Sequence, residues 1–381
     1  MTTHVFIVDE NTFKYHLEYM FAGTGAADKN VDFNSSPNSN LHHSTEGGLV
    51  SMMADGCRVR KNDLVLFYLV ATSKLDGKFF GIFQAVDDGV FLDNNDGSQY
   101  LRDELKKSLT FRLRIKPYEV YEEGVTEWSA LDEIKNICSP NQMLWSLIYR
   151  KLKGNRGNTM ITIYESERLI SLIRNKNKNR SLNIQGKKLT FDAANRCIQA
   201  VDGAAQNYTG RMDAINILPR LIEKYRKGNA HEAHLQMYIT QNIGRGTNNS
   251  LDSALGIRND SLEWIGNEVS CGVGMQRIDV AVSVVENETK RILMPIELKS
   301  KYAEIDNIAQ IKKYIKWIEQ YYIPNRQSII QPVLICKMGK PLPQNIRNGF
   351  VEFNSQNDIL PLKYIEYQVL NDNLVFNAIA Y

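Results

Sequence analysis

The sequence predicts two domains of mixed class: an N-terminal β-rich α+β domain and a C-terminal α/β domain in which helices flank a mixed sheet. A chain of 381 residues is long enough for two hydrophobic cores. Short apolar runs separated by turn residues fill the first third of the chain, whereas the last third alternates helical and strand patterns. We place these domains at 1–174 and 229–381, with a basic linker and helical connector at 175–228.

Composition is that of a soluble globular protein, with 43% hydrophobic residues, 23% charged residues and a net charge of +3. The scattered cysteines lack C-x-x-C spacing, which argues against a disulfide framework and a zinc ribbon and fits a reducing cytoplasm. No secretory signal is visible, and the longest apolar run, Leu64–Ala71, is too short to cross a bilayer. We therefore expect a cytoplasmic protein with no membrane partner.

The N-terminal domain is predicted from alternating apolar patterns and turn residues. A helix is expected at 12–20, and a long loop rich in Asn, Ser, Asp and Gly is expected at 26–48. The expected strands are 4–8, 63–71, 78–85, 89–92 and 109–115. Together they favour a small meander or barrel.

Two of these runs carry a family resemblance. The segments Lys61–Tyr68 (KNDLVLFY) and Gly77–Ala85 (GKFFGIFQA) resemble the EVE branch of the PUA-like superfamily, over about residues 1–165. The resemblance implies a DNA-reading domain that binds a modified or flipped base in an aromatic-lined pocket. Side chains that could wall such a pocket are Phe21, Phe67, Tyr68, Phe79, Phe80, Phe83 and Trp128. The alternative is that these rings belong to the hydrophobic core.

Positive charge is concentrated between Arg150 and Lys188, where 11 Lys or Arg residues face only Glu165 and Glu167. Helices are expected around this segment at 143–152 and 165–174. The predicted DNA-binding residues are Arg150, Lys151, Lys153, Arg156, Lys176, Lys178 and Arg180. A solvated linker, or a helix C-terminus with favourable dipole charges, is the alternative interpretation.

Helical patterns continue through the connector at 193–203 and 212–226. The C-terminal domain then follows the order helix, three strands, helix, strand. The expected helices are 230–242 and 305–322, and the expected strands are 262–269, 277–285, 291–298 and 332–336.

The strands at 277–285 and 291–298 bring together three charged side chains. If they form a hairpin about the polar break between them, residues whose numbers sum to 576 oppose each other, and Asp279 faces Glu297. Because strand side chains alternate with period two, Glu297 and Lys299 point the same way. Two carboxylates in a buried sheet are costly unless a cation compensates them, and Mg²⁺ prefers such oxygen ligands.

These residues resemble a nuclease signature. Asp279 followed by Pro295-Ile296-Glu297-Leu298-Lys299 resembles the PD-(D/E)xK motif, and Gln310-xxx-Tyr314 resembles the helical motif of its RecB-like branch. The region from about 228 to 337 is similar to the nuclease domains of archaeal mismatch endonucleases and of some restriction enzymes.

The resemblance implies a Mg²⁺-dependent DNA endonuclease, with Mn²⁺ as a substitute ion, and most closely a Type II restriction enzyme that is sequence-specific or modification-dependent. Asp279, Glu297 and the Leu298 carbonyl would hold the metal, and Lys299 would orient the attacking water. Gln310 would approach from its helix, and Glu232 would be a further acidic contributor.

Cleavage of both strands of double-stranded DNA by one site per chain predicts a homodimer. No Walker A loop or nucleotide fold is present, so no nucleotide cofactor is implied. His231-Glu232-Ala233-His234 lacks the H-E-x-x-H spacing of a zinc hydrolase. Two alternatives stay open: a mismatch or branched-DNA repair nuclease, and a non-catalytic nucleic-acid-binding module with a degenerate nuclease core.

Overall fold

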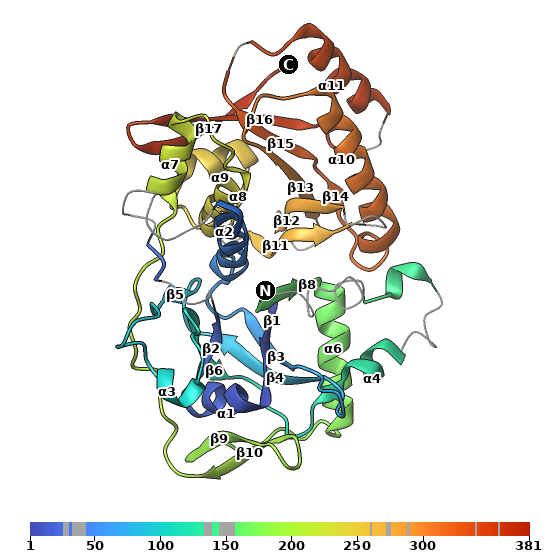
Figure 1. The fold of residues 1–381 in the computed structure, drawn as a ribbon. Helices are drawn as coiled ribbons and strands as arrows, with labels where there is room; N and C mark the ends of the chain where they lie inside the picture. The colour runs from blue at the N-terminus through green and yellow to red at the C-terminus, as the bar shows by residue number, and fades with distance from the viewer. Residues whose placement is uncertain are drawn as a thin grey trace. The chain divides into compact units, whose positions relative to one another are not determined.

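A computed structural model describes residues 1–25, 30–32, 43–132, 139–144, 157–259, 261–271, 276–287, 290–339, 341–356 and 359–381. The chain forms two compact units of mixed α/β structure (Figure 1). The N-terminal unit holds residues 1–215 except for 33–36 and 139–142, and the C-terminal unit holds the remainder. No helix in these ranges is both long enough and apolar enough to span a membrane.

The N-terminal unit is built on a curled sheet with the strand order β2-β6-β4-β3-β1-β8, to which β5 and β7 add at β6 and β4. Its strands are β1 (Thr3–Val8), β2 (Phe21–Thr24), β3 (Leu64–Leu69), β4 (Lys78–Ala85), β5 (Phe91–Leu92), β6 (Phe111–Pro117), β7 (Val125–Thr126) and β8 (Asn158–Ile161). Only β1 and β3 pair in parallel, so the sheet is mostly antiparallel. The predicted strands at 4–8, 63–71, 78–85, 89–92 and 109–115 are confirmed as β1, β3, β4, β5 and β6, whereas β2, β7 and β8 were not predicted.

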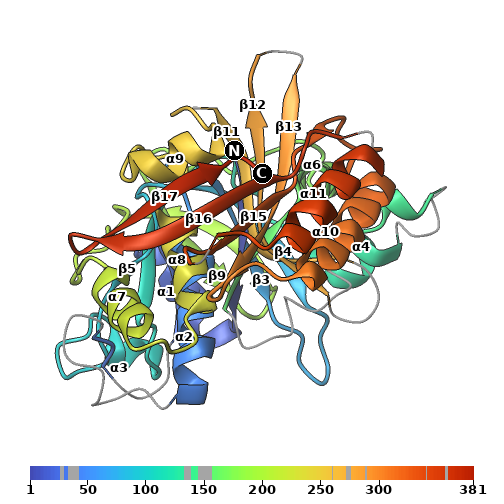
Figure 2. The same ribbon diagram turned by 90° about the horizontal axis from the view of Figure 1, so that it is seen from above.

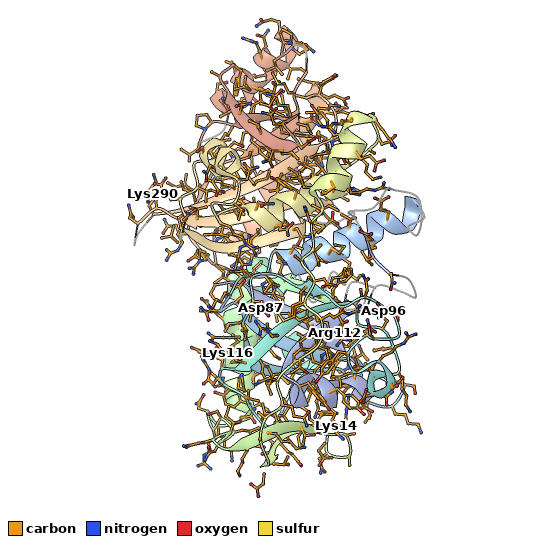
Figure 3. All side chains as sticks on the ribbon, turned by 90° about the vertical axis from the view of Figure 1, so that its left-hand side faces the viewer. Lys14, Asp87, Asp96, Arg112, Lys116 and Lys290 are labelled. Atoms are coloured by element: carbon orange, nitrogen blue, oxygen red, sulfur yellow. The ribbon has the colours of Figure 1, made fainter. Side chains whose placement is uncertain are left out.

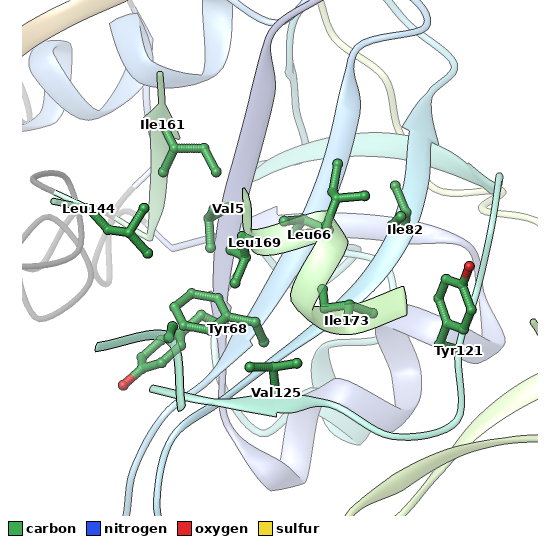
Figure 4. Packing of buried hydrophobic residues seen from close by; sticks show 13 residues of the cluster. Val5, Leu66, Tyr68, Ile82, Tyr121, Val125, Leu144, Ile161, Leu169 and Ile173 are labelled. Carbon is green, nitrogen blue, oxygen red and sulfur yellow. The ribbon is translucent and has the colours of Figure 1, made fainter. Parts of the chain in front are cut away.

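Helices cover both faces of this sheet. The helices are α1 (Glu10–Glu18), α2 (His43–Cys57), α3 (Arg102–Leu105), α4 (Glu127–Asp132) and α6 (Ile163–Lys176), with a short 3₁₀ turn, η2 (Pro140–Gln142), assigned to the other unit. A capping box between Thr162 and Glu165 begins α6, whose Leu169 and Ile173 pack on Val5 and other apolar side chains of the sheet (Figure 4). On α1, the ring of Phe13 packs against the rings of Phe67, Phe80 and Phe191.

The connector differs from its prediction. Residues 193–203 were expected to be helical, but β9 (Lys187–Asp192) and β10 (Cys197–Asp202) form an antiparallel hairpin. Leu189, Phe191 and Ile198 are buried, and the Phe191 ring stacks on α1, so tertiary packing overrides the helical pattern. The first compact unit consequently continues to Ile215, past the predicted boundary at residue 174.

The loop predicted at 26–48 is also shorter than expected, because α2 begins at His43. The sequence pattern of α2 is weakly helical, because the segment contains three glycines, Gly47, Gly48 and Gly56, and glycine disfavours helices. A Cβ on Gly56 would lie 2.5 Å from a Val90 methyl group, so glycine allows this helix to approach its neighbour closely. Most of the helix predicted at 143–152 lies outside the described residues.

The C-terminal unit holds a mixed sheet in the order β11-β12-β13-β15-β16-β17, with β14 added at β13. Figures 1 and 2 show α10 and α11 on one side of this sheet and α7, α8 and α9 on the other. The strands are β11 (Leu262–Ser270), β12 (Arg277–Val285), β13 (Arg291–Lys299), β14 (Ile329–Ile330), β15 (Val333–Lys337), β16 (Lys363–Leu370) and β17 (Asn373–Ile379). The helices are α7 (Leu218–Arg226), α8 (Glu232–Asn242), α9 (Asn249–Leu255), α10 (Ile305–Trp317) and α11 (Gln344–Gln356), and η3 (Ile318–Tyr322) is a π-turn that extends α10.

The β12–β13 hairpin has the predicted register. The residue numbers of every pair from Val280↔Ile296 to Val285↔Arg291 sum to 576. Lys290 lies at the turn end of this hairpin and projects outward (Figure 3). Because β15 then runs parallel to β13, the chain must cross over between them, and α10 supplies the crossover.

Candidate active site

Three neighbouring strands place carboxylates at one level of the C-terminal sheet. The register of β12 and β13, continued by one residue beyond the pair Val280↔Ile296, sets Asp279 across from Glu297, as the sequence predicts. The Leu298 N–H donates a hydrogen bond of 2.8 Å to Asp279 Oδ2, which ties the aspartate to the strand that carries Glu297. The structure therefore brings the two predicted metal-binding carboxylates together, with Leu298 between Glu297 and Lys299.

Glu297 is fully buried, and its two oxygens have different surroundings. Oε2 lies 2.7 Å from the Tyr314 hydroxyl, whereas Oε1 lies 2.5 Å from Lys299 Nζ. Among the described residues, Oε1 has no polar partner besides this ammonium. An oxygen in that situation retains capacity to coordinate a cation.

Helix α10 brings Gln310 and Tyr314 to the same place. A capping box between Glu304 and Asn307 begins the helix, and its buried positions recur with helical period. Gln310 Nε2 donates to the Tyr314 hydroxyl at 2.6 Å, and Gln310 Oε1 accepts from Lys299 Nζ at 3.5 Å. The Tyr314 hydroxyl also lies 2.8 Å from the Arg277 carbonyl, so its single proton is shared between that carbonyl and Glu297.

The charges in this cluster perturb one another. Burial raises the pKa of Asp279 well above its ordinary value, and the negative charge of Glu297 raises it further. Burial lowers the pKa of Lys299, but the hydrogen bonding and charge of Glu297 outweigh it, so the pKa of Lys299 rises. The pKa of the Tyr314 hydroxyl is raised by burial and by Glu297. Without an additional cation, the site therefore favours a proton on Asp279.

Glu232, the first residue of α8, lies at the end of β13. Its Oε1 accepts hydrogen bonds from the Ser300 N–H and the Ser300 hydroxyl, each 3.2 Å long. Its charge contributes to the raised pKa of Lys299, which places it near the ammonium. The described residues include no group of three or more His, Cys, Asp or Glu side chains spaced to hold a metal ion, so Glu232 does not complete such a group with Asp279 and Glu297.

Sequence reasoning missed Glu268 in β11. The pairs Asn267↔Val280 and Val269↔Ile278 flank it and set it across from Asp279. Its backbone is left-handed, with φ of 51°, and its carboxylate binds Arg277 at 2.5 Å. Glu268 also contributes to the raised pKa of Asp279. The sequence does show an acidic residue, Glu268, inside an apolar strand. Its neighbours in the sheet, however, depend on which strand β11 pairs with and in which register.

The donor set fits a hard divalent cation. Mg²⁺ is commonly held by one or two carboxylates, with waters and substrate phosphates completing its shell. Asp279 and Glu297 would supply these carboxylates, and buried Glu297 Oε1 has only the Lys299 ammonium as a polar partner in the described part of the chain. The Leu298 carbonyl stays a predicted third ligand.

Most of the aromatic residues predicted to line a base-binding pocket are buried in the core. Six of the seven aromatic side chains are core: Phe21, Phe67, Tyr68, Phe79, Phe80 and Phe83 are at most 1% exposed. They pack on one another and on α1 and α6, so they are not the walls of an open pocket. Trp128 is 56% exposed, and its indole N–H donates to Asp76 at 3.0 Å.

Of the predicted DNA-binding cations, Lys176, Lys178 and Arg180 are exposed at the C-terminal end of α6. Arg150, Lys151, Lys153 and Arg156 lie outside the described residues. DNA binding by either group stays a prediction.

No protein-family model matches the chain, and no curated protein matches it. One similar solved structure is a hypothetical protein from Leishmania major, which is 10% identical and has a TM-score of 0.29, with 46% of this chain and 96% of that chain covered. Another is the human THYN1 protein, solved in complex with DNA containing 5-methylcytosine, at 8% identity and a TM-score of 0.25, with coverage of 45% and 97%. Similarities of this size assign neither a family nor a function to the chain.

Proposed function

We propose that this protein is a Mg²⁺-dependent DNA endonuclease that hydrolyses phosphodiester bonds. One observation carries the proposal: Asp279 and Glu297 face each other on adjacent strands, and within the described ranges a buried Glu297 oxygen has no polar partner except the Lys299 ammonium. A structural ion pair needs one carboxylate for one lysine. Here a second carboxylate, Asp279, lies close enough to Glu297 that its pKa is raised. A divalent cation stabilises two ionised carboxylates held this close together.

The residues divide the chemistry among them. Asp279 and Glu297 would hold Mg²⁺, which when bound lowers the pKa of water and stabilises the charge that develops on the phosphate. Lys299 keeps its proton because its pKa is raised, so it acts as a fixed positive charge and hydrogen-bond donor beside the reacting phosphate. Tyr314 and Gln310 position Glu297 and Lys299 through hydrogen bonds.

We further propose a Type II restriction role, in which the N-terminal unit reads double-stranded DNA as an EVE-like domain and the C-terminal unit cuts it as a homodimer. The exposed cations Lys176, Lys178 and Arg180 on the N-terminal unit support contact with the phosphate backbone. One candidate site per chain supports a dimer, because cutting both strands in one event needs two sites.

The test uses purified protein, Mg²⁺ and plasmids that are unmodified, methylated or mismatch-bearing, with the ends of the products mapped. Discrete double-strand cuts at a short sequence are expected, and EDTA should abolish them. Cuts confined to modified sites would assign a modification-dependent enzyme, and cuts confined to mismatches would assign a repair nuclease. Binding without cleavage on every substrate would overturn the nuclease proposal.

A further inference from the structure

A pocket of about 370 Å³ lies beside the candidate active site in the C-terminal unit. One wall is a stripe of α10 in which Asp306, Gln310, Lys313 and Tyr314 follow one another at helical spacing. The other wall is the start of β12, including Arg277. Gln310 and Tyr314 belong both to this pocket and to the hydrogen-bond network around Glu297 and Lys299, so the pocket adjoins the proposed reaction centre.

The charges of the pocket are distributed unevenly along α10. Lys313 is exposed, and no carboxylate of the described residues lies within 4.0 Å of its ammonium. Arg277 also lines the pocket, and its backbone carbonyl lies 2.8 Å from the hydroxyl of Tyr314, the residue after Lys313. Asp306 stands seven residues before Lys313, which is about 10 Å along a helix. One end of the pocket is therefore positive, and the other end is negative.

Arg277 is held in place by Glu268, whose carboxylate lies 2.5 Å from the guanidinium. Gln236 Nε2 is directed at the same carboxylate, at 3.5 Å, and donates to the Asp279 carbonyl at 2.7 Å. The left-handed backbone at Glu268 directs this carboxylate, so the arginine is fixed by the strand that neighbours the metal-binding aspartate. A guanidinium restrained in this way loses little conformational entropy when it binds an anion.

We propose that this pocket binds a backbone phosphate of the cleaved DNA strand, next to the phosphate that is hydrolysed, through Lys313 and Arg277. This inference rests on the proposed function, and it adds a binding site and a direction for the strand. A phosphate is attracted to the Lys313 end of the pocket and repelled by Asp306. The DNA strand is therefore expected to enter the pocket at Lys313 and to reach the candidate active site next to Gln310.

The test measures DNA binding separately from cleavage. Full-length protein carrying Glu297→Gln is titrated with a fluorescein-labelled, mixed-sequence DNA duplex at several NaCl concentrations. Adding Lys313→Ala should weaken binding about 8-fold at about 0.1 M salt and reduce the slope of log K against log salt by about 1. Lys312→Ala is the matched control, because Lys312 is the neighbouring lysine of α10 and its ammonium donates to Gln356 at 3.2 Å. Lys313→Arg should restore the slope.

In the cleavage-competent protein, Lys313→Ala should raise KM by a similar factor and leave kcat nearly unchanged. Equal salt slopes for Lys313→Ala and Lys312→Ala would overturn the inference, even if the wild type cleaves DNA. A Lys313-dependent slope in a protein that never cleaves DNA would support the phosphate site and overturn the nuclease proposal.

Discussion

Each unit of the molecule buries a carboxylate cluster, and the two clusters are built in opposite ways. In the N-terminal unit, Asp93 is fully buried and accepts from Arg211 Nε at 3.1 Å and from the Tyr208 hydroxyl at 2.9 Å. The guanidinium of Arg112 lies 3.4 Å away, and the Tyr100 N–H donates at 3.1 Å. One carboxylate thus meets two arginines.

In the C-terminal unit the ratio is reversed. Asp279 and Glu297 share one lysine, and that lysine is the sole polar partner of Glu297 Oε1 among the residues that the structure describes. Both clusters are buried, so burial alone does not separate a structural cluster from a functional one. The balance of charge separates them. Two arginines around Asp93 match the carboxylates of Asp93 and Asp96, whereas the carboxylates of Asp279 and Glu297 outnumber their one lysine, an imbalance that a bound cation would relieve.

The largest effect is expected from Glu297→Gln, which removes charge from the unbalanced cluster. Cleavage should fall roughly 10³-fold, about 4 kcal/mol, because the metal loses a ligand. The variant should keep the wild-type melting temperature in EDTA, since the change also removes repulsion with Asp279. Mg²⁺ should raise the melting temperature of the wild type only. A Mg²⁺-dependent increase of equal size in the variant would show that the metal binds elsewhere.

The same kind of change in the balanced cluster should act on stability instead. Asp93→Asn leaves Arg112 buried without its counter-charge, and such a loss costs about 3–5 kcal/mol. Urea unfolding followed by circular dichroism measures the difference. Asp96→Asn is the matched control, because Asp96 binds the same Arg211 with a side chain that is 35% exposed, and its effect should be much smaller. Similar losses for both variants would mean that burial of Asp93 is unimportant.

The sequence predicted the cluster around Glu297 but not the cluster around Asp93. Asp279 and Glu297 lie in two strands joined by a short turn, so period-two alternation and the hairpin register suffice to bring them together. Asp93 meets Tyr208 and Arg211 across more than a hundred residues, and no local pattern contains that contact. The hairpin β9–β10 was predicted as a helix for a related reason, because its strand character depends on packing against α1.

Glu268 shows the same limit inside the candidate site. Its place opposite Asp279 follows from the pairing of β11 with β12, and the segment between them contributes no tight-turn signal to fix that register. Its contact with Arg277 also needs a left-handed backbone that sequence patterns for a glutamate do not predict. The meeting of Asp279 and Glu297 within one hairpin was therefore predictable, and the contacts that Glu268 makes from a third strand were not.

Lowering the pH should destabilise the N-terminal unit through protonation of the buried His16. Burial lowers the pKa of His16 to about 3, and the charge of Arg112 contributes in the same direction. Because the folded-state pKa lies below the ordinary 6.5, neutral His16 stabilises the fold above pH 6.5, and this stability is lost as the pH falls toward about 3. About 2 kcal/mol should be lost between pH 6.5 and pH 5.

The variant His16→Gln should flatten this pH dependence, because glutamine does not titrate and can still donate to the Phe21 carbonyl, which His16 Nδ1 contacts at 2.9 Å. Urea unfolding at several pH values compares the two proteins. If both lose the same stability between pH 6.5 and pH 5, His16 is not the group that responds.

The smallest effect is expected from Tyr314→Phe, which changes only the orientation of Glu297. The substitution removes the hydroxyl 2.7 Å from Glu297 Oε2 and leaves the ring in place. We expect kcat to fall about 10-fold, which corresponds to about 1.4 kcal/mol, because one hydrogen bond to a charged group is lost. KM should change little, since the tyrosine positions a ligand and the carboxylate itself remains. Tyr302→Phe, at a side chain that is 57% exposed, serves as the control.

A loss in Tyr314→Phe as large as that in Glu297→Gln would mean that the hydroxyl takes part in the reaction directly. Unchanged kcat would mean that Lys299 and Asp279 hold Glu297 in place without it. The expected 10-fold loss lies between these two outcomes, and it would show that the tyrosine orients Glu297 without reacting itself. Around Asp93 the donors fill both carboxylate oxygens, whereas around Glu297 the tyrosine orients Oε2 and leaves Oε1, which contacts Lys299, as the oxygen that would bind the proposed metal.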